Sequence, residues 1–163
     1  MQSKLLKNPV VLTAAMVLSI AAVLWLLVGR NGLTLTLLDG ETGESYLSVP
    51  VELGDTFDVS FLHSVNKSLI IERYIVEADG IYLEECYFAS YGAGVASSID
   101  GDQMLVSLED GRMKLSNIHR LLPNLQYRVG KVTDHLLEIG GQQYSLTELC
   151  GQNASVRFVL EQS

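Results

Sequence analysis

The chain has 163 residues, 48% of them hydrophobic, and a formal net charge of −8. This length suits one modest domain with an appendage. All nineteen aspartates and glutamates follow residue 30, but only eight of the eleven lysines and arginines do, so that part carries a charge of about −11. Such a surface repels phosphate backbones and anionic lipid headgroups, which disfavours nucleic-acid binding.

The amino-terminal segment PVVLTAAMVLSIAAVLWLLV, residues 9–28, is uncharged and long enough to cross a bilayer as a helix. Lys4 and Lys7 precede it, so the positive-inside rule predicts a cytoplasmic stub, residues 1–8, and export of the rest. The alternative is a cleaved signal peptide, but the exit LWLLVGRNG lacks the small residues of a cleavage site. We therefore expect a single transmembrane helix that anchors the chain in the lipid bilayer.

Residues 33–161 predict an extracytoplasmic, all-β domain. LTLTLLDG, residues 33–40, and TFDVSFLH, residues 56–63, alternate apolar with polar side chains, which is typical of half-buried strands. About ten such short segments predict an antiparallel β-sandwich or a partly open barrel. The segment NIHRLLPNL, residues 117–125, predicts one helical turn before Pro123.

Hairpin turns are predicted at three dipeptides that tolerate positive φ angles. They are Asp79-Gly80, Asp110-Gly111 and Gly140-Gly141.

A fourth hairpin is predicted in FLHSVNKSLIIERY, residues 61–74, and it contains the main candidate site. Pairing Phe61 with Tyr74 joins the two apolar faces and places His63 opposite Glu72. A register two residues tighter keeps both side chains on that face. The pair would form either a ligand or partner site, or a polar plug in which each side chain satisfies the other.

A hydrolase site is disfavoured. Ser64 adjoins His63 and therefore points to the other face, and the better-placed Ser68 lies in no nucleophile elbow. We found no complete set of nucleophile, base and orienting group, so we expect no enzyme activity.

The segments HSVNKSLIIERY and ASYGAGVAS, in this order, resemble the bacterial domain-of-unknown-function family 1850 over roughly Leu33 to Leu149. Members are similar in having an amino-terminal hydrophobic segment, and they are often encoded beside TRAP transporters of the TAXI type. The resemblance implies an accessory role near such a transporter, in a bacterial cytoplasmic membrane, and no known activity. The matching positions are His63, Ser64, Val65, Ser68, Glu72, Gly92, Ala93 and Gly94.

Three further features leave alternatives open. The segment Gly92-Ala93-Gly94 would form either a backbone nest for an anion or a corner where another backbone packs closely. Cys86 and Cys150 would form a disulfide in an oxidising compartment or remain two buried free thiols. No spacing of histidines, cysteines or carboxylates predicts a metal, and none predicts a cofactor.

We therefore expect a membrane-anchored periplasmic protein that is an auxiliary subunit or partner of a TAXI-type TRAP transporter. It would contact the membrane subunit or the solute-binding protein. The alternative is a binding module for a small anionic solute, and an enzyme is less favoured. A concave opening at His63 would favour a ligand, whereas a flat apolar patch would favour a partner. The expected contact residues are His63, Ser64, Lys67, Ser68, Glu72, Gly92, Ala93 and Gly94.

Overall fold

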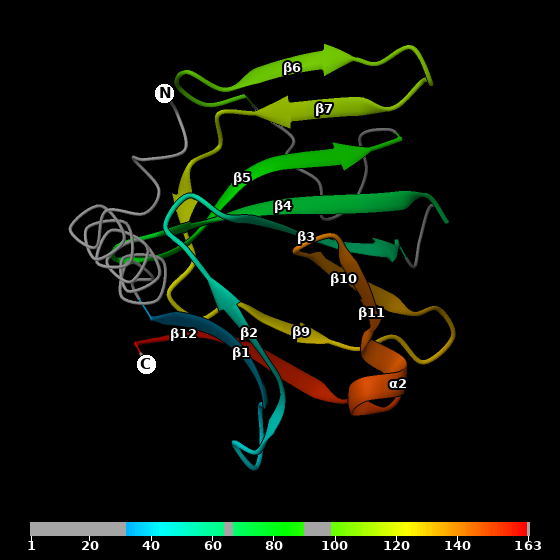
Figure 1. The fold of residues 1–163 in the computed structure, drawn as a ribbon. Coiled ribbons are helices and arrows are strands. Elements are labelled where there is room, and N and C mark those ends of the chain that lie inside the picture. Colours follow the sequence, from blue (N-terminus) through cyan, green and yellow to red (C-terminus); the bar gives the residue numbers. More distant parts are fainter. Residues whose placement is uncertain (1–31, 64–66, 90–98, 163) are drawn as a thin grey trace, which may run out of the picture. The chain divides into compact units, whose positions relative to one another are not determined.

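The computed structural model describes residues 32–63, 67–89 and 99–162, which form two antiparallel β-sheets (Figure 1). The smaller sheet contains β1 (Leu33–Asp39), β2 (Ser45–Val51), β9 (Gln126–Arg128) and β12 (Ser155–Gln162), in the order β2-β1-β12-β9. The larger sheet contains β3 (Thr56–Leu62), β4 (Leu69–Glu77), β5 (Gly80–Phe88), β6 (Met104–Ser107), β7 (Met113–Ser116), β10 (His135–Ile139) and β11 (Gln142–Ser145). Its order is β11-β10-β3-β4-β5-β7-β6, and the two-residue strand β8 (Arg120–Leu121) pairs with β5.

The two sheets share one hydrophobic core, which confirms the prediction of an all-β, sandwich-like fold. Leu35 and Leu37 of β1 are fully buried in it, together with residues of the larger sheet. The ring of Phe57 on β3 lies 5.7 Å from that of Phe158 on β12 and 5.0 Å from that of Tyr74 on β4. Offset ring pairs of this kind add to the energy of burial, so these aromatics hold the sheets together.

Of the three predicted two-residue turns, Gly140-Gly141 is present as predicted, between Ile139 of β10 and Gln142 of β11. Antiparallel hairpins also join β4 to β5 and β6 to β7, but their turns differ from the prediction. Gly80 already pairs with Glu77, so the first turn is Ala78-Asp79, and the second is longer than two residues because Ser107 pairs with Met113. Gly140 and Gly141 both have positive φ, 58° and 74°, as a primed turn requires.

The predicted helical turn in residues 117–125 is wrong. Arg120 and Leu121 are extended in β8 because they pair with Leu83 and Tyr82 of β5. The described part of the chain instead has a short helix at α2 (Leu146–Cys150). Ser145 caps it by accepting a hydrogen bond from the Glu148 N–H at 3.0 Å.

The β3–β4 register also differs from the prediction. Phe57, not Phe61, lies opposite Tyr74, and Glu72 lies opposite Val59. The hairpin is tight because the His63 N–H donates to the Ser68 carbonyl at 2.8 Å. A shift of four residues leaves every side chain on its predicted face, so the apolar pattern cannot distinguish the two registers. A shorter turn leaves more residues of β3 and β4 able to pair, and these additional pairs favour the observed register.

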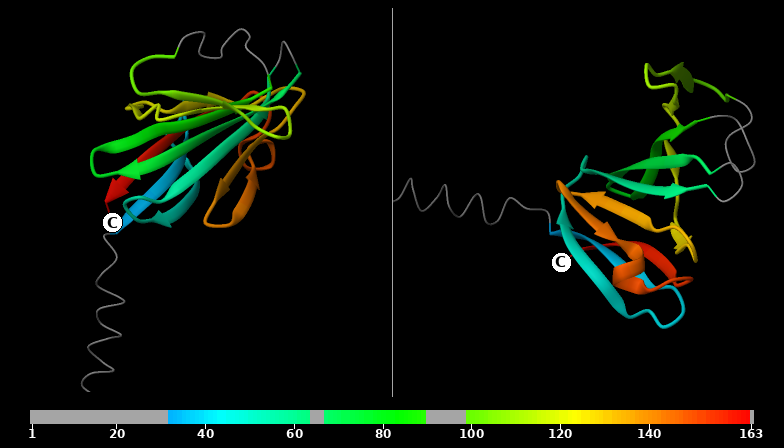
Figure 2. Two further views of the ribbon diagram at one scale, coloured as in Figure 1. Left: turned by 90° about the horizontal axis from the view of Figure 1, so that it is seen from above. Right: turned by 90° about the vertical axis from the view of Figure 1, so that its right-hand side faces the viewer.

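The two ends of β12 define two ends of the β-domain. Gln162 pairs with Leu33, the first residue of β1, whereas Ser155 pairs with Arg128 at the end of β9. The eight residues of β12 separate these points by roughly 23 Å. The end of β3 and the start of β4 lie away from the start of β1 (Figures 1 and 2).

The predicted membrane anchor, residues 9–28, lies outside the described residues, as does the stub of residues 1–8. Within residues 32–63, 67–89 and 99–162, no helix is long and apolar enough to span a membrane.

We predict that Phe57→Ala lowers the free energy of unfolding by about 3–5 kcal/mol, because it removes a ring that contacts both sheets. Leu53→Ala is the matched control, since its side chain is 48% exposed, and it should change stability by less than about 0.5 kcal/mol. Denaturant titration of the full chain measures both. Equal effects of the two substitutions would contradict the shared core.

Candidate functional site

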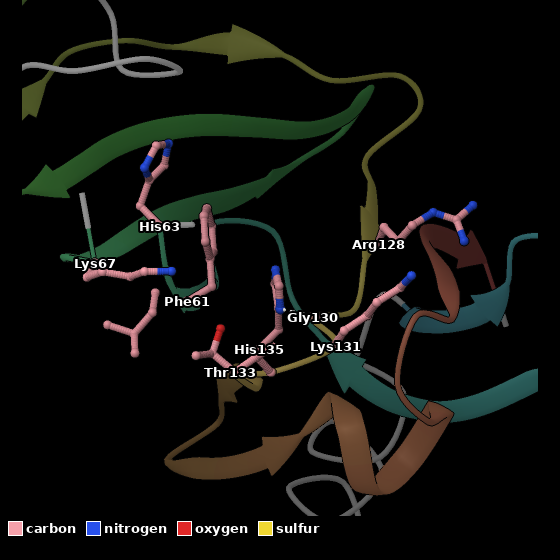
Figure 3. A pocket seen from close by; sticks show the side chains of 10 residues that line it. Phe61, His63, Lys67, Arg128, Gly130, Lys131, Thr133 and His135 are labelled. Carbon is pink, nitrogen blue, oxygen red and sulfur yellow. Dashed lines mark hydrogen bonds between the residues drawn. The ribbon is translucent and has the colours of Figure 1, made fainter. Parts of the chain in front are cut away.

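A cavity of about 450 Å³ lies between the β3–β4 turn and the segment that joins β9 to β10 (Figure 3). We call it the mouth pocket. Its described lining residues are Phe61, Leu62, His63, Lys67, Arg128, Gly130, Lys131, Val132, Thr133 and His135. The concave opening expected for a ligand site is therefore present beside His63.

The joining segment is held in place by backbone contacts. Val129 is buried, and its N–H donates to the Ala154 carbonyl at 2.9 Å. Gly130 packs so closely that a Cβ there would lie 2.1 Å from the Thr133 carbonyl oxygen, which only glycine permits. The segment is thus a fixed wall anchored to the start of β12.

His135 and Phe61 form the aromatic floor of the mouth pocket. They are opposite each other on β10 and β3, and their rings stack at 4.9 Å with an interplanar angle of 15°. The Gly130 N–H donates to His135 Nδ1 at 3.2 Å, which leaves Nε2 to carry the ring proton of the neutral imidazole. Burial lowers the pKa of His135 below its ordinary value of 6.5, against a weaker opposing effect of Asp134. A neutral ring with a donor nitrogen therefore lines the pocket.

The charge of the mouth pocket is positive. Lys67, Arg128 and Lys131 line it, and none of its described lining residues is acidic. Arg128 donates to the Asn153 carbonyl at 2.9 Å, a bond that leaves its charge uncompensated. Lys67 also has a left-handed backbone, with φ of 54°, a conformation that is uncommon for residues other than glycine.

Two other cations of the larger sheet, Arg73 and Lys114, are neutralised. Arg73 makes two hydrogen bonds of 2.8 Å to Asp58, and Lys114 pairs with Glu85. No such salt bridge reaches Lys67, Arg128 or Lys131 from any residue that the structure describes. In a domain with an excess of carboxylates, the mouth pocket is therefore a local region of uncompensated positive charge.

The acidic neighbour of the pocket, Asp134, is directed to α2. Its Oδ1 accepts the Thr147 N–H at 2.9 Å. Although burial raises the pKa of Asp134, hydrogen bonds from Ser145 and Thr147 lower it overall, so its charge is satisfied away from the cavity.

Glu72 lies behind the floor and does not pair with His63, which corrects the predicted pairing. It lies opposite Val59, whereas His63 is four residues beyond Val59, just past the end of β3 and roughly 13 Å away along the chain. Glu72 Oε2 accepts hydrogen bonds from Tyr74 at 2.9 Å and from Tyr127. Burial and the charge of Glu72 raise the pKa of both tyrosines, so both remain donors.

This buried network supports the pocket. The ring of Tyr127 meets those of Phe61 and His135 edge-on, at 6.0 Å and 5.8 Å. Glu72 fixes the Tyr127 hydroxyl, and so it positions the aromatic floor from behind. Glu72 was expected to belong either to a ligand or partner site or to a structural polar plug. Its contacts are those of a structural plug, although its partners are tyrosines.

The other predicted site residues divide into two groups. His63 and Lys67 line the mouth pocket, and the Ser68 carbonyl closes the turn beside them. The remaining predicted positions lie outside the described residues: Ser64, Gly92, Ala93 and Gly94.

Sequence reasoning missed the second wall, residues 128–135. The sequence does contain a signal for this wall, the segment RVGK. It places two of the eight cations that follow residue 30 within four positions, with a glycine between them.

Two alternatives were open for Cys86 and Cys150, a disulfide or two free thiols, and in the structure both are free thiols. Cys86 is on β5, between Glu72 and Leu115, whereas Cys150 ends α2. Burial raises the pKa of Cys86 to about 12 and that of Cys150 to about 11, so both are poor nucleophiles. The alternative of two partly buried free thiols is the one observed.

Two other places carry less chemistry. A hollow of about 580 Å³ borders β12 and the β4–β5 turn, but its one cation, Arg157, shares it with Asp79 and Glu161. In residues 32–63, 67–89 and 99–162, no three histidine, cysteine or acidic side chains gather in a way that could hold a metal ion.

We predict that His135 makes stability depend on pH. Because its pKa is lowered by folding, the unfolded chain binds the proton more tightly, and the free energy of unfolding falls as the pH drops below about 6.5. Denaturant titration between about pH 7 and about pH 5 measures this slope. His135→Gln should reduce the slope, and an unchanged slope would contradict a buried neutral imidazole.

Comparison with protein-family models matches residues 57–146 to a domain of unknown function, DUF1850. The matched region includes every described residue that lines the mouth pocket. Neither the curated proteins nor the solved structures contain a match.

Proposed function

Because this chain belongs to the DUF1850 family, whose function is undefined, we propose from the geometry of the mouth pocket that its β-domain binds a small anionic solute without transforming it. One observation carries the proposal: Lys67, Arg128 and Lys131 surround a cavity of about 450 Å³ without a carboxylate partner among the described residues. Cavities of this volume accommodate small organic molecules.

The contributions of the individual cations are modest. Lys67, Arg128 and Lys131 are exposed, and an exposed ion pair contributes only about 0.2–1 kcal/mol. Several of these cations must therefore act together, and with the aromatic floor, to bind a solute. The expected affinity is in the range of roughly micromolar to millimolar.

The position of the pocket supports a solute or a partner in the extracytoplasmic space. Arg128 pairs with Ser155, at the end of β12 that lies roughly 23 Å from the Leu33–Gln162 pair. We propose that residues 9–28 anchor the chain in the bacterial cytoplasmic membrane. Within the β-domain, the pocket lies at the end remote from Leu33, the first residue of β1.

An auxiliary role for a TAXI-type TRAP transporter is the second candidate. Three apolar side chains favour it: Leu62 and Val132 line the pocket, and Leu69 pairs with Leu62. Together they offer a contact surface beside the cations. Leu62 and Leu69 are each 42% exposed, and Val132 is 94% exposed. The solute-binding protein is the favoured partner over the membrane subunit, since the pocket lies far from Leu33.

We predict that a carboxylate raises the thermal unfolding temperature of the full chain in detergent, because a ligand of the folded state stabilises it. A panel of mono-, di- and tricarboxylates provides the probes. Lys67→Gln and Lys131→Gln should each weaken binding about two- to fivefold, the effect of one exposed ion pair.

Arg120→Gln is the matched control. Arg120 pairs with Leu83 of β5 and does not line the pocket, so its loss should leave binding unchanged. The proposal fails if no carboxylate shifts the transition, or if all three variants bind equally.

For the transporter role, we predict that Leu69→Ser combined with Val132→Ser lowers recovery of the solute-binding protein on co-purification. The control is Leu53→Ser, a similar loss of exposed apolar surface elsewhere. Equal recovery with both variants would reject a partner surface at the pocket.

A further inference from the structure

The cations of the mouth pocket come from two separate walls. Lys67 belongs to the β3–β4 turn of the larger sheet, and Arg128 ends β9 of the smaller sheet. Lys131 follows Arg128 on the joining segment. Figure 3 shows Lys67 on one side of the Phe61 and His135 rings, and Lys131 with Arg128 on the other side. The two groups of cations therefore flank the aromatic floor from opposite sides, an arrangement that favours a ligand with two separated anionic ends over one compact anion.

The space between the two walls is mainly apolar. Phe61, Leu62 and Val132 contribute carbon surface to it, and Phe61 stacks on the neutral ring of His135. The polar groups there include the Thr133 hydroxyl and the Nε2 of His135, which is the donor because Nδ1 accepts from Gly130. This middle section suits a hydrocarbon chain with at most one or two acceptor atoms.

We propose that the ligand is an organic dianion, an aliphatic dicarboxylate whose two ends are held by Lys67 and by Lys131 with Arg128. This inference rests on the proposed function and specifies its ligand class. Once one carboxylate is bound, the second meets its cation at a high effective concentration, so the two ends reinforce each other. A monocarboxylate of the same length satisfies only one wall and leaves the other cation solvated.

Isothermal titration of the full chain in detergent tests the proposal, with adipate and hexanoate as probes of equal chain length. Adipate should bind at least about fivefold more tightly than hexanoate, which corresponds to one additional ion pair of about 1 kcal/mol. A series from succinate to suberate should show one preferred length, because the walls are fixed. Inorganic phosphate, a compact anion, should bind no better than hexanoate.

Substitution of the lysine of either wall should remove the tighter binding that the second carboxylate provides. In Lys67→Met and in Lys131→Met, adipate should bind within about twofold of hexanoate, whereas Arg120→Gln should retain the full difference. Circular dichroism of each variant verifies that the sheets are intact.

The outcomes separate the two proposals. If hexanoate and adipate bind the wild-type chain equally and Lys131→Met weakens both, the dianion is rejected and the anion site remains. If no carboxylate binds at all, both proposals are rejected. If phosphate binds most tightly, the site is one compact anion site and the two-wall ligand is rejected.

Discussion

In the β3–β4 hairpin, a backbone hydrogen bond from His63 to Ser68 keeps the turn short and thereby holds Phe57 opposite Tyr74. The rest of the domain depends on this register. It places Phe57 against both Tyr74 and Phe158, so that the two sheets share one core. It also brings Phe61 to the end of the sheet, where β10 supplies His135 as its stacking partner.

The same register separates two kinds of charged group. Glu72 is moved away from His63 and into contact with the hydroxyls of Tyr74 and Tyr127, where its charge is satisfied. Lys67 is left at the turn, facing a wall that carries two more cations. Carboxylates thus neutralise Arg73 and Lys114 on the outer surface, whereas the cavity keeps its positive charge. The shared core and the positive charge of the mouth pocket are two consequences of one strand alignment.

Much of the fold follows from local chemistry, and that part was predictable. Alternation in TFDVSFLH and paired glycines at Gly140-Gly141 specify strands and turns without reference to distant residues. The register was not predictable, because shifts of two or four residues keep every side chain on the same face. Helix α2 was missed although Ser145 and Glu148 form a recognisable capping pair. The wall at residues 128–135 was missed because only the packing of two sheets brings it to Lys67, which lies some sixty residues earlier.

The most direct test of the central claim observes the lysines themselves. The chain has five: Lys4, Lys7, Lys67, Lys114 and Lys131. Dimethylation with ¹³C preserves their charge and gives each a separate NMR signal that can be followed during titration with a carboxylate. We expect saturable shifts of Lys67 and Lys131 with one common affinity, and none for Lys114, which Glu85 already neutralises. Equal, non-saturating shifts of all five signals would contradict it.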